Sequence, residues 1–387
     1  MDKQNIPEGW KKIKLKEVLT EVNERNKEQK VKRVLSVTNS QGFVNQEDYF
    51  DGAVHSADIS NYKIIRKNQF AYNPSRVNVG SIDILKDYDE GALSPMYVVF
   101  KVDESKLLPD YFKYYFQTHR FFESVKNNTQ GSVRNSLSFK SLINFEYLLP
   151  TIEEQIKIIK ILNIIDKIIK IQENKSEEVK KEKEYIIGKI FDDNILNIEK
   201  KGKIKDIMYF EGGSQPDKKY FSNKKLDQYI RLIQIRDYKT DDYVTYIPEK
   251  MARKICKKDD VMIGRYGPPI FQILRGLEGA YNVALIKTIP RENITKDFVY
   301  YVLKQEKLFN KIDWLSQRSS GQTGVDMEFL NNYSIIIPTK EEQNKITKIF
   351  RIYDNKIFEI EECIKYYGIL KKALMQKLLT GKVRVKK

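Results

Sequence analysis

The sequence has few of the side chains that most often hold metals, form disulfides or transfer protons. It contains only two cysteines and two histidines in 387 residues. Cys256 and Cys363 match no zinc-binding or redox spacing, so a reducing cytosol suits the chain. With only His55 and His119 available, histidine-based catalysis and histidine-rich metal sites have little support. We expect His119, which lies among aromatic residues, to be structural.

Long apolar runs and nucleotide-binding motifs are also missing. No run approaches the roughly 20 apolar residues of a membrane-spanning helix. The opening residues MDKQNIPEGW lack the apolar stretch of a secretory signal, so we expect a cytoplasmic location. There is no phosphate-cradling Gly-Lys-Ser/Thr loop and no convincing nuclease cluster of carboxylates. The NPSR run at Asn73 lacks the Pro-Pro-aromatic pattern of amino-methyltransferases. These absences predict a chain that is not itself an enzyme.

Basic charge, by contrast, is abundant. The chain carries 69 basic and 53 acidic residues, a formal net charge of +16, together with 41% hydrophobic residues, enough for a sizeable core. The surplus points first to nucleic acid and second to an anionic membrane, and the lack of long apolar runs weakens the second. Charge that serves only solubility is the alternative. Segments 201–338 and 339–387 hold most of the surplus, +7 each.

A decamer occurs twice. LPTIEEQIKI begins at Leu149 and IPTKEEQNKI begins at Ile337, so the two prolines lie 188 residues apart. Fainter matches at about the same offset precede it, such as the Gly-Ala pairs at Gly91 and Gly279. Each half therefore has the same order, a mixed segment and then a long helix. The predicted segments are 1–150, helix 151–195, 196–338, and a helix with a C-terminal tail at 339–387.

Both helices carry start signals and a heptad pattern. Thr151 with Glu154, and Thr339 with Glu342, have the spacing of a capping box. Heptad spacing then predicts the seam of a coiled coil in each copy. The seam positions of the first helix are Ile158, Leu162, Ile165, Ile169, Gln172, Ser176, Val179, Lys183, Ile186 and Ile190. Those of the second are Ile346, Phe350, Tyr353, Ile357, Ile360, Ile364, Tyr367, Lys371, Leu374 and Leu378.

The two helices are each other's expected partners. Each spans about 40 residues, hence roughly 60 Å at ~1.5 Å per residue. If the halves face each other across a pseudo-two-fold axis, the helices run antiparallel. Both copies place a lysine at the same seam position, Lys183 and Lys371. Such a lysine can specify register, and the alternative is a side chain that snorkels near a frayed end.

The mixed segments predict α+β globular domains. Strand-like runs such as YVVFKV and YSIII alternate with loops and with one aromatic helix, DYFKYYFQTHRFFESV. The overall prediction is an α+β fold with two pseudo-symmetric globular domains separated by two long helices that pair as an antiparallel coiled coil.

Four polar loops stand at equivalent places in the two halves. They are YNPSRVNVGS and NTQGSVRNS in the first half, and IGRYGPPIFQ and QRSSGQTGVD in the second. Glycine lets the backbone approach a ligand, and Arg or Asn can bond base edges in the major groove. An ordinary polar turn is the alternative for any one loop. The candidate DNA-binding residues are Asn73, Ser75, Arg76, Asn78, Ser81, Gln130, Arg134, Asn135, Arg265, Tyr266, Arg318 and Gln322.

Together these motifs carry a family resemblance. The two P-T-x-E-E-Q-x-K-I helix starts, PEGW at Pro7, the GSVR and GQTG stretches, and LLTGKVRV from Leu378 resemble the DNA-specificity subunit of a Type I restriction-modification system. The resemblance covers the whole chain. One departure is that the second half lacks a counterpart of Trp10, so its entry is expected to pack differently.

The resemblance implies a function. Each globular domain would be a target-recognition domain for one half of a split site in double-stranded DNA. The helices would bind two methyltransferase (modification) subunits, and restriction/translocase subunits would join them. S-adenosylmethionine, ATP and Mg would belong to those partners, with no cofactor on this chain. Two alternatives remain open: the specificity component of a Type IIB-like restriction enzyme, and a coiled-coil scaffold that does not bind DNA.

Overall fold

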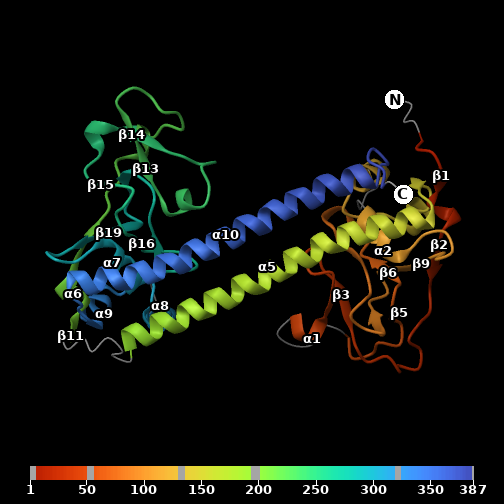
Figure 1. The fold of residues 1–387 in the computed structure, drawn as a ribbon, viewed down its shortest axis with the longest axis horizontal. Helices are drawn as coiled ribbons and strands as arrows, with labels where there is room; N and C mark the ends of the chain where they lie inside the picture. The colour runs from red at the N-terminus through yellow and green to blue at the C-terminus, as the bar shows by residue number, and fades with distance from the viewer. Residues whose placement is uncertain (1–5, 50–55, 130–135, 193–200, 319–323, 386–387) are drawn as a thin grey trace. The chain divides into compact units, whose positions relative to one another are not determined.

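The computed structural model describes residues 6–49, 56–129, 136–192, 201–318 and 324–385. The chain packs as two compact units (Figure 1). Unit 1 comprises Met1–Gln172 with Cys363–Lys387, and unit 2 comprises Glu173–Glu362. Each unit thus combines one globular segment with part of both long helices. Because this division cuts through the helices, it differs in kind from the predicted segment boundaries, which follow chain order and stay a prediction.

Unit 1 is built on an antiparallel four-stranded sheet in the order β2-β9-β6-β7. Three two-stranded sheets accompany it, β1-β10, β3-β4 and β5-β8. The strands are β1 Lys11–Lys14, β2 Leu19–Val22, β3 Leu35–Val37, β4 Phe43–Asn45, β5 Lys63–Arg66, β6 Phe70–Tyr72, β7 Ile82–Ile84, β8 Glu90–Leu93, β9 Val98–Val102 and β10 Glu146–Leu149. The helices are η1 Leu15–Glu17, α1 Gln46–Tyr49, η2 Val77–Val79, α2 Pro109–Tyr115, α3 His119–Thr129 and α4 Phe139–Leu142.

Unit 2 repeats the main sheet in the order β12-β19-β16-β17 and adds a second sheet, β14-β13-β18-β15, and the pair β11-β20. The strands are β11 Lys201–Lys203, β12 Met208–Gly212, β13 Tyr229–Ile233, β14 Tyr246–Pro248, β15 Ile255–Cys256, β16 Met262–Gly264, β17 Gln272–Leu274, β18 Gly279–Tyr281, β19 Leu285–Pro290 and β20 Ser334–Ile336. The helices are α6 Ile204–Ile207, η3 Lys218–Tyr220, η4 Ile235–Tyr238, η5 Glu249–Met251, α7 Lys296–Leu303, α8 Glu306–Arg318 and α9 Met327–Asn332.

The matching strand orders confirm the predicted duplication. β6 corresponds to β16 and β7 to β17, so the loops that join them occupy the same place in each unit. The Gly-Ala pairs also fall at one topological position. Ala92 forms a parallel bridge with Val34, and Ala280 pairs in parallel with Leu232. The predicted α+β fold with two pseudo-symmetric globular segments is confirmed.

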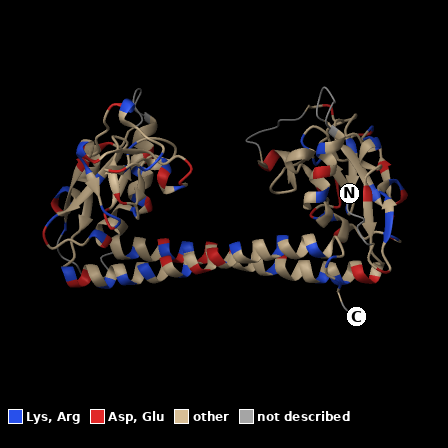
Figure 2. Cartoon of the chain, turned by 90° about the horizontal axis from the view of Figure 1, so that it is seen from above, with Lys and Arg blue, Asp and Glu red and all other residues tan. Residues whose placement is uncertain are grey.

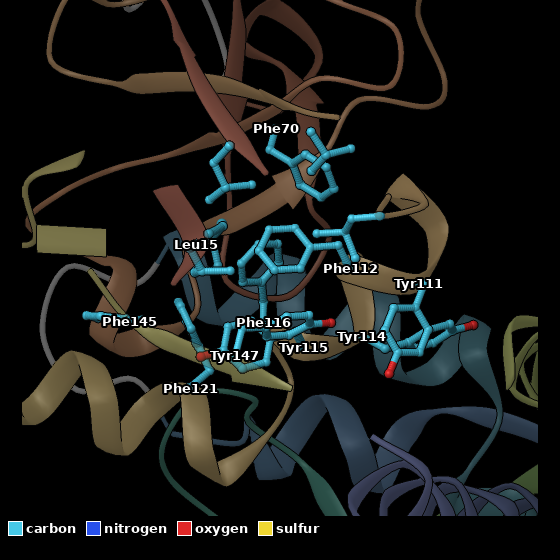
Figure 3. Close-up of a cluster of buried hydrophobic side chains, with 14 of the residues drawn as sticks. Leu15, Phe70, Tyr111, Phe112, Tyr114, Tyr115, Phe116, Phe121, Phe145 and Tyr147 are labelled. Atoms are coloured by element: carbon cyan, nitrogen blue, oxygen red, sulfur yellow. The ribbon is translucent and has the colours of Figure 1, made fainter. Parts of the chain in front are cut away.

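An aromatic core fills unit 1 (Figure 3). Phe70 from β6 stacks on Phe100 from β9 with ring centroids 5.2 Å apart, and Phe112 from α2 meets Phe70 edge-on at 5.7 Å. Such edge-to-face and stacked pairs are the favoured geometries of buried rings. Both long helices contribute to each core. Ile158 and Met375 lie in the core of unit 1, and Phe191 and Phe350 lie in that of unit 2. These contacts join each globular segment to the two helices of its own unit.

The predicted single aromatic helix is wrong in one respect, because it forms two helices, α2 and α3. Thr118 interrupts it: its hydroxyl donates to the Tyr115 carbonyl at 2.7 Å and accepts from the Phe121 N–H at 3.2 Å. A side chain that closes one helix and starts the next competes with continuous helical bonding. His119 then begins α3 with an exposed side chain, 3.4 Å from the carboxylate of Glu123.

The long helices are α5, Ile152–Asp192, and α10, Lys340–Leu378, with 41 and 39 residues. They pair antiparallel, since Asp166 meets Lys371 in unit 1 and Lys183 meets Asp354 in unit 2. All twenty predicted seam positions are buried or half-buried, so the predicted coiled-coil seam is confirmed. Both seam lysines form ion pairs with aspartates, so neither is a side chain that merely snorkels to solvent. Basic and acidic residues are interspersed along both long helices (Figure 2).

Each long helix is attached to its globular segment by a buried glutamine from the repeated decamer. Gln155 Oε1 accepts from the Leu108 N–H at 2.8 Å, and its Nε2 donates to the carbonyls of Lys106 and Pro150. Gln343 repeats the pattern: its Oε1 accepts from the Thr295 N–H at 2.9 Å, and its Nε2 donates to the carbonyls of Asn293 and Pro338. Both glutamines are fully buried. Each one ties the start of α5 or α10 to the start of α2 or α7.

The predicted capping boxes have different outcomes. In α10 the box is complete, because Glu342 accepts from the Thr339 N–H at 2.7 Å and the Thr339 hydroxyl accepts from the Glu342 N–H at 3.4 Å. In α5 only the threonine half forms, with the Glu154 N–H 3.4 Å from the Thr151 hydroxyl. The Glu154 carboxylate instead binds Trp10 and Arg384. The second half has no such tryptophan, so the expectation that its entry packs differently is confirmed.

Candidate nucleic-acid interface

The β6–β7 loop of unit 1 presents polar side chains from a rigid backbone. Asn73 Oδ1 accepts from the Ser75 N–H at 3.0 Å, and the Asn73 N–H donates to the Ser81 carbonyl at 3.1 Å. Gly80 has φ +95°, a conformation in which a side chain would be strained. Ser75, Arg76 and Asn78 are exposed. The Arg76 side chain is exposed, and its guanidinium forms no hydrogen bond or ion pair with another described residue.

Ser81 is placed differently from its neighbours. It is buried, and its hydroxyl donates to the Val37 carbonyl at 2.7 Å. This bond fastens the end of the loop to β3, so the hydroxyl is already occupied. The sequence did not show that Ser81 is buried. Ser81 directly precedes β7, and the direction of its side chain depends on the neighbouring strand β3.

The β16–β17 loop of unit 2 presents an arginine and a tyrosine together. The Arg265 guanidinium lies over the Tyr266 ring, 5.2 Å from its centroid, and both residues are exposed. The Arg265 N–H donates to the Ala284 carbonyl at 2.8 Å, and the Phe271 N–H donates to the Gly264 carbonyl at 3.1 Å. Backbone hydrogen bonds therefore hold the loop at both of its ends. A stacked guanidinium and ring can bond base edges or stack on bases.

In each unit, the second predicted loop lies against the first. The Leu137 N–H, which follows α3, donates to the Pro74 carbonyl at 3.0 Å. In unit 2, a Cβ added at Gly324 would lie 3.5 Å from Tyr266 Cε1. Among the described residues, the chain next to or at the end of each second loop thus contacts the first loop of the same unit. Gln130, Arg134, Asn135 and Gln322 lie outside the described residues, and Arg318 is described only as the last residue of α8.

Two further polar surfaces were not anticipated from the sequence. In unit 1, a cavity of about 290 Å³ joins Asn73 and Arg76 to Thr38, Asn39 and Tyr49, which follow β3 or end α1. In unit 2, the segment after β13 lines a depression of about 780 Å³, where Arg236 lies 5.5 Å from the ring centroid of the exposed Tyr243. Because β3 and β13 are equivalent strands, these two segments lie at matching places in the two units. An arginine interleaved with tyrosines was the sequence signal available for the second.

The side chains that most often hold metals or act as nucleophiles were also located in the structure. Among the described residues, no group of three or more His, Cys, Asp and Glu side chains could hold a metal ion. Cys256 is fully buried, and burial raises the pKa of its thiol to about 11, which makes it unreactive near neutral pH. His55 lies outside the described residues. No described helix is long and apolar enough to cross a membrane.

Comparison with known proteins identifies the family. The type I restriction modification DNA specificity domain matches residues 7–181 and again residues 199–366. The chain belongs to this family. The two matches cover the two halves of the sequence repeat, so each half is one copy of the domain.

Relatives and solved structures agree with this assignment. The type I restriction enzyme MjaVIII specificity subunit of Methanocaldococcus jannaschii is 23% identical over 98% of this chain and 94% of the relative. The proposed MjaX specificity subunit of the same organism is 24% identical over 98% and 95%. In fold, the chain resembles the type I S subunit from M. genitalium, with TM-score 0.56, 14% identity and 98% of both chains covered. It also resembles a chain from a study of complex assembly and conformational transition of the type I R-M system, with TM-score 0.64, 13% identity, and 98% and 100% covered.

Proposed function

We propose that this chain is the non-catalytic, DNA-reading subunit of a restriction-modification complex, in which each unit reads one half of a split target in double-stranded DNA. The observation that carries the proposal is the pair of equivalent loops, β6–β7 and β16–β17, each of which exposes an arginine, Arg76 or Arg265. The net charge of +16 supports contact with phosphates. Different loop sequences in the two copies favour two different half-sites.

Partner subunits supply the chemistry in this proposal. Two methyltransferase subunits bind to the paired helices, one for each copy of the repeat, and restriction/translocase subunits join them. S-adenosylmethionine then belongs to the methyltransferase, and ATP and Mg to the translocase. The duplicated helix starts, with Gln155 and Gln343 in the same bonding pattern, support equivalent attachment sites.

The test is reconstitution. The purified chain alone should neither methylate nor cleave DNA, whereas the chain with its methyltransferase subunit should methylate a split site. Duplex binding by that complex should weaken as salt rises. Methylated bases mapped genome-wide with and without the gene then identify the target. Methylation by the chain alone, with partner contamination excluded, contradicts the proposal, and salt-insensitive or absent duplex binding favours a protein scaffold.

A further inference from the structure

Three side chains from three helices meet in unit 1. Asp166 of α5 receives Lys371 of α10 on Oδ1, with Nζ 2.6 Å away. Its Oδ2 lies 2.9 Å from the hydroxyl of Tyr114 on α2, and Asn163 Oδ1 lies 2.7 Å from the same hydroxyl. The hydroxyl proton serves one of these acceptors at a time. The Lys371 ammonium also lies 5.4 Å from the Tyr114 ring centroid.

The same arrangement occurs in unit 2 with the helix roles exchanged. Asp354 of α10 receives Lys183 of α5 on Oδ1 at 2.5 Å, and the Tyr301 hydroxyl of α7 donates to its Oδ2 at 2.6 Å. The Lys183 ammonium lies 5.6 Å from the Tyr301 ring centroid. Asp166 with Asp354, and Lys183 with Lys371, are 188 residues apart, the offset of the repeat. We call each set a Lys–Asp–Tyr triad.

A heptad seam alone specifies register weakly. Moving one helix by seven residues returns apolar positions to the seam, so the apolar side chains discriminate poorly between the two alignments. A lysine in the seam does discriminate, because its ammonium needs a carboxylate when it is withdrawn from water. The side chain of Lys183 is 11% exposed and that of Lys371 is 17% exposed. A seven-residue shift in one direction would place Lys183 opposite Thr347 and Lys371 opposite Ile159, which offer no carboxylate. The opposite shift would place them opposite Glu361 and Glu173, so the lysines discriminate against the first shift more strongly than against the second.

The tyrosine of each triad connects the helix pair to the globular segment. Tyr114 and Tyr301 are buried on the first helix after the main sheet, so their hydroxyls hold that helix against the aspartate. A slip of the helix that carries the aspartate would break both of its bonds, and a slip of the other long helix would break the ion pair. The alignment of α5 with α10 and the position of the globular segment on these helices therefore depend on the same three side chains.

We propose that the residues of the two Lys–Asp–Tyr triads are positioning residues. They fix the register of α5 with α10 and the position of each globular segment on these helices. Recognition is thereby confined to one spacing between the half-sites. This inference rests on the proposed function, a split DNA target. The six residues act through the placement of the recognition loops and do not contact DNA. Their loss should leave the half-site sequences unchanged and relax only the spacing.

Register can be measured without DNA. Nitroxide labels at the exposed Lys181 and Lys356 report the alignment of α5 with α10 in unit 2, with Cys363→Ser removing the accessible thiol. Electron–electron resonance should give one narrow distance. Lys183→Met keeps the length and apolar stem but removes the charge, and should broaden the distribution or add a maximum displaced by up to about 10 Å, one heptad at ~1.5 Å per residue. If the distance distribution between the two labels stays narrow and unchanged in Lys183→Met, the triads do not fix the helix register.

Spacing is measured in the assembled complex. With the methyltransferase subunit present, methylated sites should show one spacer for the unaltered chain and additional spacers for Lys183→Met combined with Lys371→Met. Lys175→Met with Lys348→Met, exposed lysines of the same two helices, is the matched control and should keep one spacer. Destabilisation alone would lower total methylation without adding spacers. A single unchanged spacer in the active double variant overturns the inference.

Two milder variants distinguish a loss of helix register from a loss of folding. Tyr114→Phe with Tyr301→Phe removes only the hydroxyls and should also add spacers, to a smaller extent. The exchange Lys183→Asp with Asp354→Lys restores an ion pair of opposite sense, although Tyr301 loses its aspartate acceptor. It should return the narrow distance that Lys183→Asp alone loses. Failure of this rescue overturns the proposal. If the unaltered complex methylates nothing, the proposed function is wrong. The distances between the labels then still show whether the triads fix the helix register.

Discussion

The indole N–H of Trp10 donates to Glu154 Oε2 at 2.7 Å, across 144 residues of sequence. Arg384, from the tail beyond α10, donates to the same carboxylate through Nε at 2.7 Å and a terminal nitrogen at 2.9 Å. Glu154 is buried and therefore depends on these donors. Glu342, the equivalent residue, caps its own helix instead. One residue of the repeat thus has two roles, because unit 1 places a tryptophan and an arginine beside Glu154, whereas Glu342 bonds to the described Thr339 of its own helix start.

Truncation of the two glutamates should have unequal effects. Glu154→Ala should destabilise unit 1 by about 2–3 kcal/mol, because Trp10 and Arg384 lose a charged acceptor and Arg384 is then partly rehydrated. Glu342→Ala removes an exposed cap and should destabilise unit 2 by about 1 kcal/mol. Hydrogen exchange read by mass spectrometry reports each unit separately. Equal effects of the two substitutions would show that the buried contacts of Glu154 add nothing to stability.

Gln155→Ala and Gln343→Ala should each destabilise its own unit by about 3 kcal/mol. Each substitution strands one backbone N–H and two carbonyls in a buried junction, and an unsatisfied buried group costs about 1–3 kcal/mol. Gln→Glu at either site should be similarly harmful, because a carboxylate cannot donate to the two carbonyls. The exposed Gln117→Ala serves as the control, with a change within about 0.5 kcal/mol. Denaturant unfolding followed by hydrogen exchange measures all five variants, and a neutral Gln155→Ala would contradict this role.

Acid stability should depend on Asp260. Burial works against its ionisation, but bonds from Lys296, the Lys257 N–H and Lys287 outweigh this and lower its pKa from 3.8 to about 2. A carboxyl with a lowered folded-state pKa stabilises the protein above its unfolded-state pKa, and this contribution is lost as pH falls through the folded-state value. Asp260→Asn should therefore cost about 2 kcal/mol at pH 7.

The pH profile supplies the control for that prediction. The stability difference between Asp260→Asn and the unaltered chain should stay constant down to about pH 4 and shrink between 3.8 and about 2. Asp259→Asn changes an exposed carboxylate that shares Lys296, and should have little effect. Chemical unfolding of unit 2 across this range is the measurement. A difference that grows on acidification would have the wrong sign and would exclude the assignment.

Arg76→Ala should weaken recognition of one half-site and Arg265→Ala recognition of the other. A base contact removed in this way costs about 1–3 kcal/mol and relaxes specificity at the position it reads. Competition binding of the complex with duplexes altered in one half at a time distinguishes the two halves. Uniform weakening on all duplexes would instead identify the arginine as a phosphate contact or a structural residue.

Helix length should set the spacer between half-sites. A seven-residue deletion in each helix, 172–178 in α5 and 359–365 in α10, preserves the seam because seven residues are nearly two full turns. Both deletions lie between the triads and leave Asp166, Lys183, Asp354 and Lys371 in place. Each helix shortens by roughly 10 Å at ~1.5 Å per residue, so the spacer could shrink by up to about three base pairs.

Methylation mapping of the double-deletion complex measures the spacer directly. The half-site sequences should be unchanged while their separation decreases. An active complex with an unaltered spacer would show that the helices do not set the distance. Altered half-site sequences would show that recognition extends beyond the globular segments. Either single deletion should perform worse than the pair, because it misaligns one triad.

Local patterns were readable from the sequence alone. The heptad seam, the helix starts and the duplicated loops depend on residues within a few turns or on spacing, and a repeat at 188 residues displays them twice. The loop positions of Arg76 and Arg265 followed for the same reason. Ser81, by contrast, has the composition of an exposed loop residue but bonds to Val37, 44 residues away. Asn39 and Arg236 lie in segments whose proximity to those loops arises only when the sheets assemble.

The sequence by itself determined which residues belong to each helix seam and that the chain consists of two copies of one design. Periodicity and capping are encoded within each segment, so no distant contact is needed to infer them. Tertiary structure alone decided which partner each charge has. Lys183 meets Asp354 across 171 residues, and Glu154 turns from its own helix cap to Trp10. These choices depend on which buried groups lack partners once the helices and sheets have packed.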